Sequence, residues 1–415
     1  MSAQTNSATT ADMLGAAAEG AGLVSHLQPI VALPDEATVG FEALARWPSL
    51  DNPSPLDVFT HAAVAGQAND LDQLCIDAAL RAALMRQLPR GTLLAINCEP
   101  ASTYVGRREN EALNRGHDEL TVMFELTERD LLAHPHALLS KVAALREDGF
   151  LLALDDVGAH PDSLALLDIL APDVIKLDLH LVQSQPRRDQ TRILAAVLAH
   201  HERTGATILA EGIENDDHLE QALALGATLG QGYKYPGPDT HEGIRPWTPP
   251  GPTPSCQASP GSPFDLLASG VPTRIARKQT LTAFSQHIEA QAGDTHDHPM
   301  VLTALQQDQY FTPAIRDRYE ELAQSSPLVA VFGQHLPTDL GNQVRGVRLS
   351  PTDPLSTEWT VLALGPQISV ALIGRECDSQ VNRNRADDDR RFDFTITYNR
   401  ALVTAVAHNL LNRID

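Results

Sequence analysis

Acidic and amide side chains follow several apolar runs of this sequence, at the points where those runs end. Asn97 closes the run LLAIN, Glu125 closes TVMFE, Asp155 and Asp156 follow FLLAL, and Glu211 follows TILA. Each has an ordinary explanation by itself, because Asn and Asp often cap turns and Glu often begins a helix. Two adjacent carboxylates repel each other, however, unless water or a cation offsets their charges. Taken together, the series predicts a cation site built from oxygen ligands.

Oxygen ligands of this kind suit hard divalent ions such as Mg²⁺ and Mn²⁺. Two such ions about 3.5–4 Å apart can activate water and clamp a phosphate, which is what hydrolysis of a phosphodiester requires. Three further residues are candidates for the same site: Glu42 in FEALARW, and Lys176 with Asp178 in IKLD. The alternatives stay open for each, since a lone Glu in this context is usually a helix residue and Lys176 with Asp178 could form a simple ion pair.

The elements that must position these residues alternate between short apolar runs and amphipathic stretches. The candidate strands are Leu93–Asn97, Thr121–Glu125, Phe150–Asp155, Asp173–Asp178 and Thr207–Glu211. Helical patterns cover His136–Glu147 and Gln190–Arg203. This alternation indicates a parallel sheet, either open or closed. A closed barrel gathers the carboxyl ends of all its strands at one mouth, whereas an open sheet binds ligands at one crevice, so the distribution of polar residues favours a barrel.

The order EALAR, LLAIN, ELTE, LDDVG, IKLD, AEGIE and QGY resembles the EAL family of cyclic di-GMP phosphodiesterases, from about Leu27 to Pro238. The resemblance implies a TIM-like (β/α) barrel of the EAL type. It also implies two bound metal ions, Mg²⁺ or Mn²⁺, and hydrolysis of cyclic di-GMP to linear pGpG. The sequence contains no GG[DE]EF motif, so synthesis of the dinucleotide is not expected.

The resemblance assigns roles to individual residues of this sequence. The implied metal ligands are Glu42, Asn97, Glu125, Asp155 and Asp156. The implied catalytic residues are Lys176, which would orient the water or a phosphate oxygen, Glu211, which would assist as a base, and Glu42. The implied substrate-binding residues are Gln28, Arg46, Asp178 and Gln231, and Glu128 and Glu214 would support the neighbouring loops.

The loop after Asp156 departs from the family pattern. It reads Val-Gly-Ala-His-Pro-Asp-Ser over residues 157–163, where family members have Phe-Gly-Thr-Gly-Tyr-Ser-Ser. Pro161 stiffens this loop by fixing φ and removing a hydrogen-bond donor. In the family this loop holds the two metal ions in place and often forms the interface between two barrels. The departure therefore affects two expectations: catalytic turnover, and a homodimer formed through the barrel. The alternative to an active enzyme is a weak or inactive EAL domain that acts as a cyclic di-GMP receptor or as a signalling scaffold.

The bulk composition narrows the class of partner. A net charge of −22 and an aromatic content of 5% disfavour a DNA or RNA polymer, which needs a basic surface and stacking side chains. A small anionic nucleotide remains compatible because metals can carry the positive charge. No apolar run approaches the length of a membrane span. The four cysteines are far apart and show no CxxC spacing, which favours a cytoplasmic location.

The chain of 415 residues is expected to contain two domains, because it is too long for one ordinary core. The expected parts are a disordered lead-in over 1–22, the EAL-type barrel over 23–245, a Pro-rich linker over 246–263 and a smaller α/β domain over 264–415. The last part carries candidate strands at Pro327–Phe332, Thr360–Leu364 and Ile368–Ile373, with a helical apolar stripe from Leu402 to Leu411. Its pattern resembles the DICT sensory domain, which implies a regulatory module with an unknown signal or protein partner.

Overall fold

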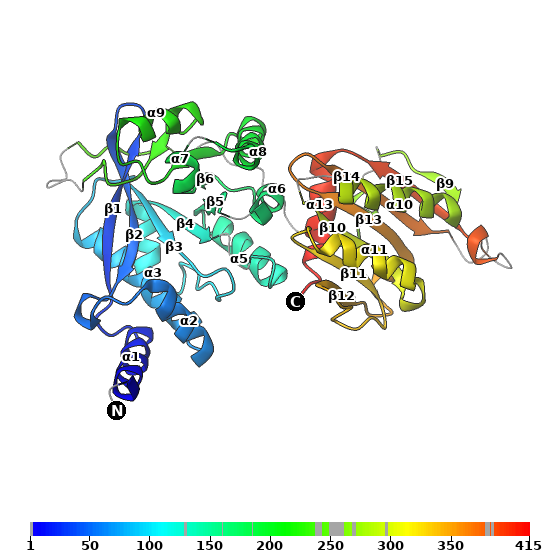
Figure 1. Cartoon of the computed structure of the whole chain (residues 1–415), viewed down its shortest axis with the longest axis horizontal. Helices are drawn as coiled ribbons and strands as arrows, with labels where there is room; N and C mark the ends of the chain where they lie inside the picture. The colour runs from blue at the N-terminus through cyan, green and yellow to red at the C-terminus, as the bar shows by residue number, and fades with distance from the viewer. Residues whose placement is uncertain are drawn as a thin grey trace. The chain divides into compact units, whose positions relative to one another are not determined.

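The structure is a computed structural model, and it falls into two compact units that are described separately below (Figure 1). The described residues are 3–127, 131–159, 161–184, 186–236, 243–248, 261–267, 271–294, 298–377, 382 and 386–415. The first unit comprises Met1–Leu131, Ala137–His160 and Pro172–Thr253, and the second comprises Leu132–His136, Pro161–Ala171 and Pro254–Asp415. Most of the linker expected over 246–263 lies outside the described residues.

The first unit is a closed barrel of eight strands, as the distribution of polar residues predicted. In barrel order the strands are β1 (Val24–Ala32), β2 (Ala37–Arg46), β3 (Leu93–Asn97), β4 (Thr121–Thr127), β5 (Leu151–Val157), β6 (Val174–Leu177), β7 (Thr207–Ala210) and β8 (Leu229–Gly230). Apolar side chains fill the interior, among them Ile30, Met123 and Leu209. The barrel is therefore a packed core that carries its polar residues at the strand ends.

The first strand is antiparallel to both of its neighbours, β2 and β8, while the remaining strand pairs are parallel. The parallel sheet expected from the sequence is thus incomplete. Only residues 33–36 join β1 to β2, and a connection this short permits a hairpin but not a parallel crossover. The hairpin places Gln28 directly opposite Glu42 in the strand register.

Helices follow most of the barrel strands. Their bounds are α2 (Pro55–Ala65), α3 (Ala68–Met85), α4 (Glu111–Glu119), α5 (Pro135–Glu147), α7 (Leu179–Val182), α8 (Arg188–Thr204) and α9 (Asp216–Ala224). The helical patterns at 136–147 and 190–203 correspond to α5 and α8. No helix among the described residues is both long and apolar enough to cross a lipid bilayer.

The N-terminal stretch differs from the expectation of a disordered lead-in over 1–22. It forms the helix α1 (Ala3–Ala18). Ala17 and Ala18 are buried in a small apolar cluster that includes Trp47 and Val58. The small side chains that suggested disorder instead allow close packing against α2.

The second unit contains a seven-stranded mixed sheet in the order β12-β11-β10-β13-β14-β15-β9. Its strands are β9 (Arg274–Arg277), β10 (Met300–Gln307), β11 (Val329–Gln334), β12 (Val344–Arg348), β13 (Glu358–Leu364), β14 (Ser369–Glu376) and β15 (Arg391–Thr397). The helices α10 (Lys278–Asp294) and α11 (Pro313–Ala323) bury an apolar core against one face. The helix α13 (Arg400–Leu411) packs against β13 and β14 through the apolar stripe that the sequence indicated.

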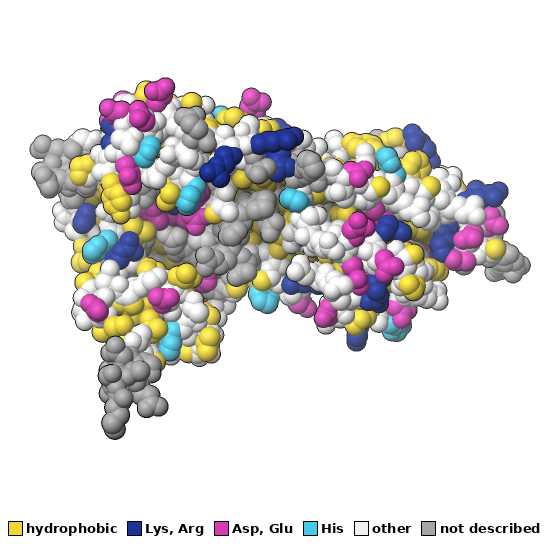
Figure 2. Space-filling view, viewed as in Figure 1, with side chains coloured by type: hydrophobic (Ala, Val, Ile, Leu, Met, Phe, Trp, Pro, Cys, Tyr) yellow, Lys and Arg dark blue, Asp and Glu magenta, His cyan; other side chains and the backbone are white. Residues whose placement is uncertain are grey.

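Charged side chains of both signs are interspersed on the face of this unit that Figure 2 shows. Within the unit Arg277 pairs with Asp389 at 3.2 Å, and Arg318 pairs with the buried Glu289 at 2.8 Å. These charges offset one another locally, so the face presents a mixed polar surface.

Candidate active site and metal centre

Three carboxylates from the barrel strands β2, β4 and β5 and one from the residue after β7 surround one buried ammonium group. The Nζ atom of Lys176 on β6 lies 2.8 Å from Asp155, 2.9 Å from Glu211, 3.0 Å from Glu125 and 3.5 Å from Glu42. The Lys176 side chain is 0% exposed. Lys176 and the four acids therefore form one cluster, as the barrel interpretation predicted from residues far apart in the sequence.

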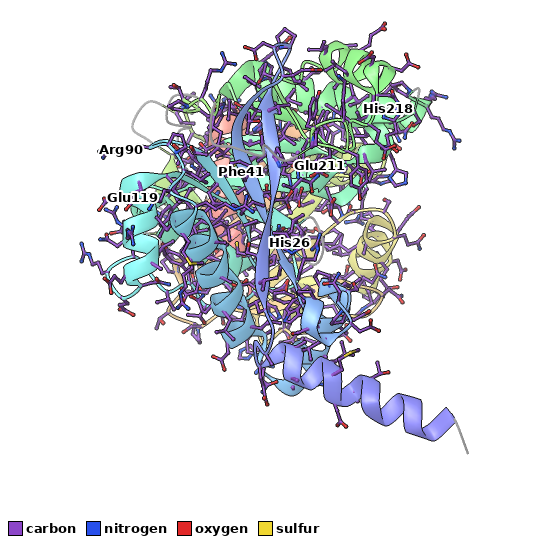
Figure 3. The ribbon with its side chains drawn as sticks, turned by 90° about the vertical axis from the view of Figure 1, so that its left-hand side faces the viewer. His26, Phe41, Arg90, Glu119, Glu211 and His218 are labelled. Carbon is purple, nitrogen blue, oxygen red and sulfur yellow. The ribbon has the colours of Figure 1, made fainter. Side chains whose placement is uncertain are left out.

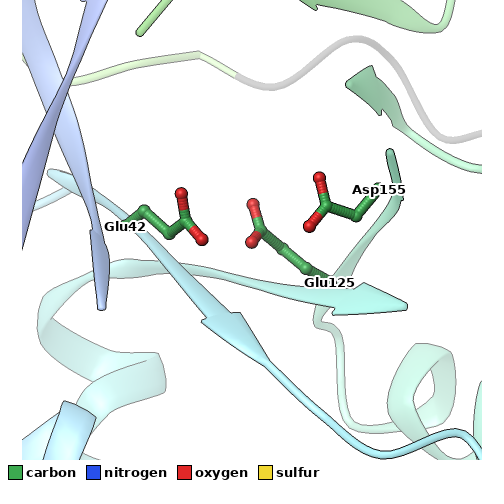
Figure 4. Close-up of side chains that lie close together, drawn as sticks. All are labelled: Glu42, Glu125 and Asp155. Atoms are coloured by element: carbon green, nitrogen blue, oxygen red, sulfur yellow. The ribbon is translucent and has the colours of Figure 1, made fainter. Parts of the chain in front are cut away.

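Glu42, Glu125 and Asp155 direct their carboxyl groups toward one another (Figure 4). They come from β2, β4 and β5, and one oxygen of each lies within 4.8 Å of the others. A second group under the same limit contains Asp155, Asp156 and Glu211. Figure 3 labels Glu211 among the side chains of the barrel. Because Asp155 belongs to both groups, the arrangement suits two neighbouring cations that share one carboxylate.

Asp156 faces the same side as Asp155 because the strand is irregular at this point. Successive side chains of a regular strand point to opposite faces. The register of β5 with β6 shifts between Leu154 and Val157, and Asp156 has a positive φ of 56°. A bulge of this kind re-aims a side chain, and a left-handed conformation at a non-glycine residue is a form of strain found at functional sites. Apart from the adjacent Asp155 and Asp156, no sequence pattern indicates this bulge.

Two amide side chains fix the orientation of Glu42. Asn97 Nδ2 donates to Glu42 Oε1 at 2.9 Å, and Gln231 Nε2 donates to Glu42 Oε2 at 2.6 Å. Asn97 thereby keeps its Oδ1 as the atom that can bind a cation. Burial alone would raise the pKa of Glu42, but the charge of Lys176 and these two hydrogen bonds hold the pKa below its ordinary value.

Glu125, Glu211 and Asp156 have raised carboxyl pKa values. Burial and the nearby charge of Glu42 raise the pKa of Glu125 well above its ordinary value. Burial, together with the charges of Asp155 and Glu42, raises the pKa of Glu211 to about 8. Burial and the charge of Asp155 raise the pKa of Asp156 to about 6. One lysine is therefore too little positive charge for this many carboxylates.

The donor set fits divalent metal ions. The Oε1 atom of Glu125 is buried and has no hydrogen-bond donor among the described residues. The residues of both groups offer carboxylate oxygens, which are the ligands that Mg²⁺ and Mn²⁺ prefer. A cation would give the buried oxygen a partner and would relieve the repulsion that raises the carboxyl pKa values.

The remaining predicted residues lie around this cluster or apart from it. Arg46 donates to the carbonyl of Ala45 at 2.8 Å and is half-buried. Asp178 caps α7 by accepting from the backbone N–H of His180 at 2.9 Å. Glu214 is exposed just before α9. Glu128 lies outside the described residues. The substrate-binding and loop-supporting roles of these residues remain predictions.

Sequence reasoning missed a buried network beneath the loop that follows Asn97. Lys141 on α5 donates to Ser102 Oγ at 2.6 Å and to the carbonyl of Glu99 at 2.5 Å. Asp72 on α3 accepts from the backbone N–H of Glu99 at 2.9 Å. The sequence feature that could have indicated this network is a charged residue among the apolar residues of each helix. Asp72 follows Leu71, and Lys141 precedes Val142. The network anchors the backbone two residues beyond a predicted metal ligand.

An eight-stranded barrel with acidic strand ends around a lysine belongs to the class of (β/α) barrels with a polar site at one mouth. The chain belongs to the EAL family, because the sequence model of the EAL domain matches residues 11–238, more than half of the chain. The model described as a sensory domain in diguanylate cyclases and two-component systems, DICT, matches residues 266–377. Both resemblances predicted from the sequence are thereby confirmed.

Curated relatives are similar to the barrel portion. The probable cyclic di-GMP phosphodiesterase PdeG of Escherichia coli is 30% identical over 246 residues, which are 57% of this chain and 48% of the relative. The cyclic di-GMP phosphodiesterase RocR of Pseudomonas aeruginosa is 31% identical over 229 residues, which are 52% of this chain and 58% of the relative. The chain thus spans about half the length of the curated relatives that it matches.

Solved structures are similar over the same region. One is Klebsiella pneumoniae BlrP1 in a manganese/cy-diGMP complex, with 30% identity and a TM-score of 0.44 over 51% of this chain and 55% of that chain. Another is the PaMucR phosphodiesterase in a c-di-GMP complex, with 27% identity and a TM-score of 0.45 over 51% of this chain and 94% of that chain.

The raised carboxyl pKa values predict that metal binding strengthens as the pH rises. Below pH 8 the carboxyl of Glu211 is largely protonated in the metal-free protein, and below pH 6 that of Asp156 is too. A proton must leave before such a group can bind a cation, so protons compete with the metal on the acid side of each pKa. We expect Mn²⁺ affinity to increase between pH 6.5 and 8.5, by up to about tenfold per pH unit for each proton released.

Calorimetric titration with Mn²⁺ in buffers of different ionisation enthalpy measures both the affinity and the protons released. Glu211→Gln should reduce the protons released at pH 7.5, whereas Glu220→Gln, a change at an exposed position of α9, should not. Equal affinity at pH 6.5 and 8.5 without proton release would contradict the raised pKa values.

Proposed function

We propose that this protein is a cyclic di-GMP phosphodiesterase that hydrolyses its substrate to linear pGpG and is regulated through its C-terminal domain. The observation that carries the proposal is the pair of carboxylate groups that share Asp155 beside the buried Lys176. Relatives named as cyclic di-GMP phosphodiesterases support the choice of substrate.

The proposed metal site divides into two parts. Glu42, Asn97, Glu125 and Asp155 would hold one ion, and Asp155 with Asp156 and Glu211 would hold the second. Bound Mg²⁺ or Mn²⁺ would supply positive charge for the phosphate oxygens and lower the pKa of a water molecule. The ligands contribute rigidity, since the Glu42 carboxylate is already oriented by Asn97 and Gln231.

The remaining residues of the site act on the water and the substrate in this proposal. Lys176 orients the attacking water, and Glu211 accepts the proton that the water gives up. The water oxygen bonds to phosphorus, and the bond from phosphorus to one sugar oxygen breaks. That sugar oxygen takes up the proton held by Glu211, and the opened ring is pGpG. Gln28 and Arg46 bind the nucleotide, Arg46 through a phosphate oxygen.

A receptor that binds cyclic di-GMP without cleaving it is the second candidate. The observation that favours it is the sequence of residues 157–163, which departs from the EAL pattern directly after Asp156. Misplacement of a reacting group by about 1 Å can cost about 100-fold in rate, so a complete ligand set with a displaced loop could bind and not turn over.

Incubation of the full chain with cyclic di-GMP separates the two candidates. We expect pGpG to accumulate with Mg²⁺ or Mn²⁺ and to stop accumulating when a chelator removes the metal, as followed by reversed-phase chromatography. Restoration by added Mn²⁺ controls for damage by the chelator. Saturable binding of cyclic di-GMP without product under any metal condition would overturn the enzyme and support the receptor.

A further inference from the structure

The middle of the chain between β5 and β6, Pro161–Ala171, belongs to the second unit and not to the barrel unit. Residues Pro161–Ala171 form η2 (Pro161–Leu166) and α6 (Leu167–Leu170) within that unit. This segment is flanked by residues of the candidate active site. Asp156 lies five residues before Pro161, and Lys176 lies five residues after Ala171. Two site-bearing strands are therefore joined by chain that is packed in the other unit.

Helix α13 of the second unit contacts this segment through Arg400. Its guanidinium forms an ion pair with Asp168 on α6. The same guanidinium donates to the carbonyls of Gly365 at 3.0 Å and Pro366 at 2.9 Å. The two carbonyls hold the guanidinium at the turn between β13 and β14, and an arginine held in this way binds a carboxylate with a defined direction.

A second contact lies near the other end of α13. His408 Nε2 donates to the backbone carbonyl of Ile169 at 2.7 Å, and His408 is buried. The apolar residues Leu167, Ile169 and Leu170 are buried as well. Arg400 and His408 are two turns apart on one helix, so α13 holds α6 at two points.

Left-handed backbone is found before the held segment and at its C-terminal end. Asp156 has a φ of 56° and Ala171, which ends α6, has a φ of 45°. Such angles are uncommon for non-glycine residues and cost free energy that the surrounding contacts must offset. Asp173, two residues beyond Ala171, accepts from the backbone N–H of Leu152 on β5 at 2.9 Å, so the end of the segment is also tied to the strand that carries Asp155 and Asp156.

We propose that Arg400 is a positioning residue for the metal centre: by holding α6 against α13, it sets the positions of Asp155, Asp156 and Lys176. The C-terminal domain thereby controls the barrel through the segment 161–171. A signal that shifts α13 pulls on the chain between two ligand-bearing strands and changes metal affinity. The expected change in turnover rests on the proposed function. The expected change in metal affinity can be measured without turnover.

The test compares Arg400→Gln with Arg413→Gln in the full chain. Arg413 also pairs with an acid of the second unit, Asp353 at 3.2 Å, but makes no described contact with residues 161–171. We expect Arg400→Gln to weaken Mn²⁺ binding at least about tenfold in calorimetric titrations, because groups that orient metal ligands contribute about 10–100-fold to affinity. Arg413→Gln should change the affinity less than about twofold.

Turnover and rescue provide further readouts. Arg400→Gln should lower kcat about tenfold or more and leave the KM for cyclic di-GMP within about twofold, since Gln28 and Arg46 are untouched. Arg400→Lys retains a positive charge for Asp168, so it should recover part of the Mn²⁺ affinity. If Arg400→Gln lowers the melting temperature, the Mn²⁺ affinity of Arg400→Lys decides the test. Unchanged Mn²⁺ affinity in both Arg400 variants would overturn the inference. Lack of turnover by the unaltered protein would overturn the proposed function alone.

Discussion

Glu42→Gln is expected to lower hydrolysis of cyclic di-GMP by more than about 100-fold. The replacement removes the charge that helps hold a cation next to Glu125 and Asp155. It also disturbs the hydrogen bonds, because Asn97 and Gln231 both donate to the carboxylate, and an amide accepts at only one of its two terminal atoms. Groups that merely orient metal ligands contribute about 10–100-fold, so loss of a ligand should cost more.

Product formation under saturating Mn²⁺ measures this effect. Glu220→Gln provides the same chemical change at an exposed position and should retain full activity. Calorimetry with Mn²⁺ should show weaker binding in Glu42→Gln, while its circular dichroism spectrum stays that of the unaltered protein. Retention of more than about a tenth of the activity would show that Glu42 is not a metal ligand in turnover.

The strand-end residues could be predicted from the sequence because two regular features specify them. Apolar runs of four or five residues between amphipathic stretches indicate parallel strands, and the residue that ends each run lies near the mouth of a barrel. Asn97, Glu125 and Glu211 were identified in this way. The prediction that these residues lie near one barrel mouth depends on where the strands end and not on their contacts. It therefore does not change when a strand bound is wrong by a residue or two.

Features that depend on tertiary contacts escaped prediction. The bulge that turns Asp156 toward Asp155 depends on the register between β5 and β6, which the residues of β5 do not specify. The helix α1 forms in a stretch expected to be disordered, because Ala17 and Ala18 pack beside Trp47. Both outcomes follow from neighbours that are distant in the sequence, which local patterns cannot report.

The division of the chain illustrates the same limit. Pro-rich composition indicated a single boundary over 246–263, and composition can reveal only contiguous domains. The second unit also includes residues 161–171 because α6 packs against α13, a contact between segments more than 200 residues apart. The apolar sequence of α6 is compatible with packing in either unit, so the assignment depends on the contact with Arg400 and His408.

Lys176→Met is expected to destabilise the metal-free protein by about 3–5 kcal/mol, because it leaves buried carboxylates without their counter-charge. For a barrel of this size that corresponds to a fall in melting temperature on the order of 10 °C. Mn²⁺ should restore most of the loss, since a bound cation provides the charge that Lys176 supplied to Glu125, Asp155 and Glu211. Turnover should remain at least about 100-fold lower, because the group that we propose orients the water is missing.

Lys141→Met separates this effect from the loss of any buried lysine. Lys141 is also buried and pairs with Asp72, but its partners are outside both carboxylate groups of the metal centre. Its replacement should lower the melting temperature, and Mn²⁺ should then raise it only as much as in the unaltered protein. If Lys176 is the internal counter-ion of the metal-free site, Mn²⁺ must raise the melting temperature of Lys176→Met more than that of Lys141→Met or of the unaltered protein. An equal gain in all three would mean that the metal does not replace the charge of Lys176.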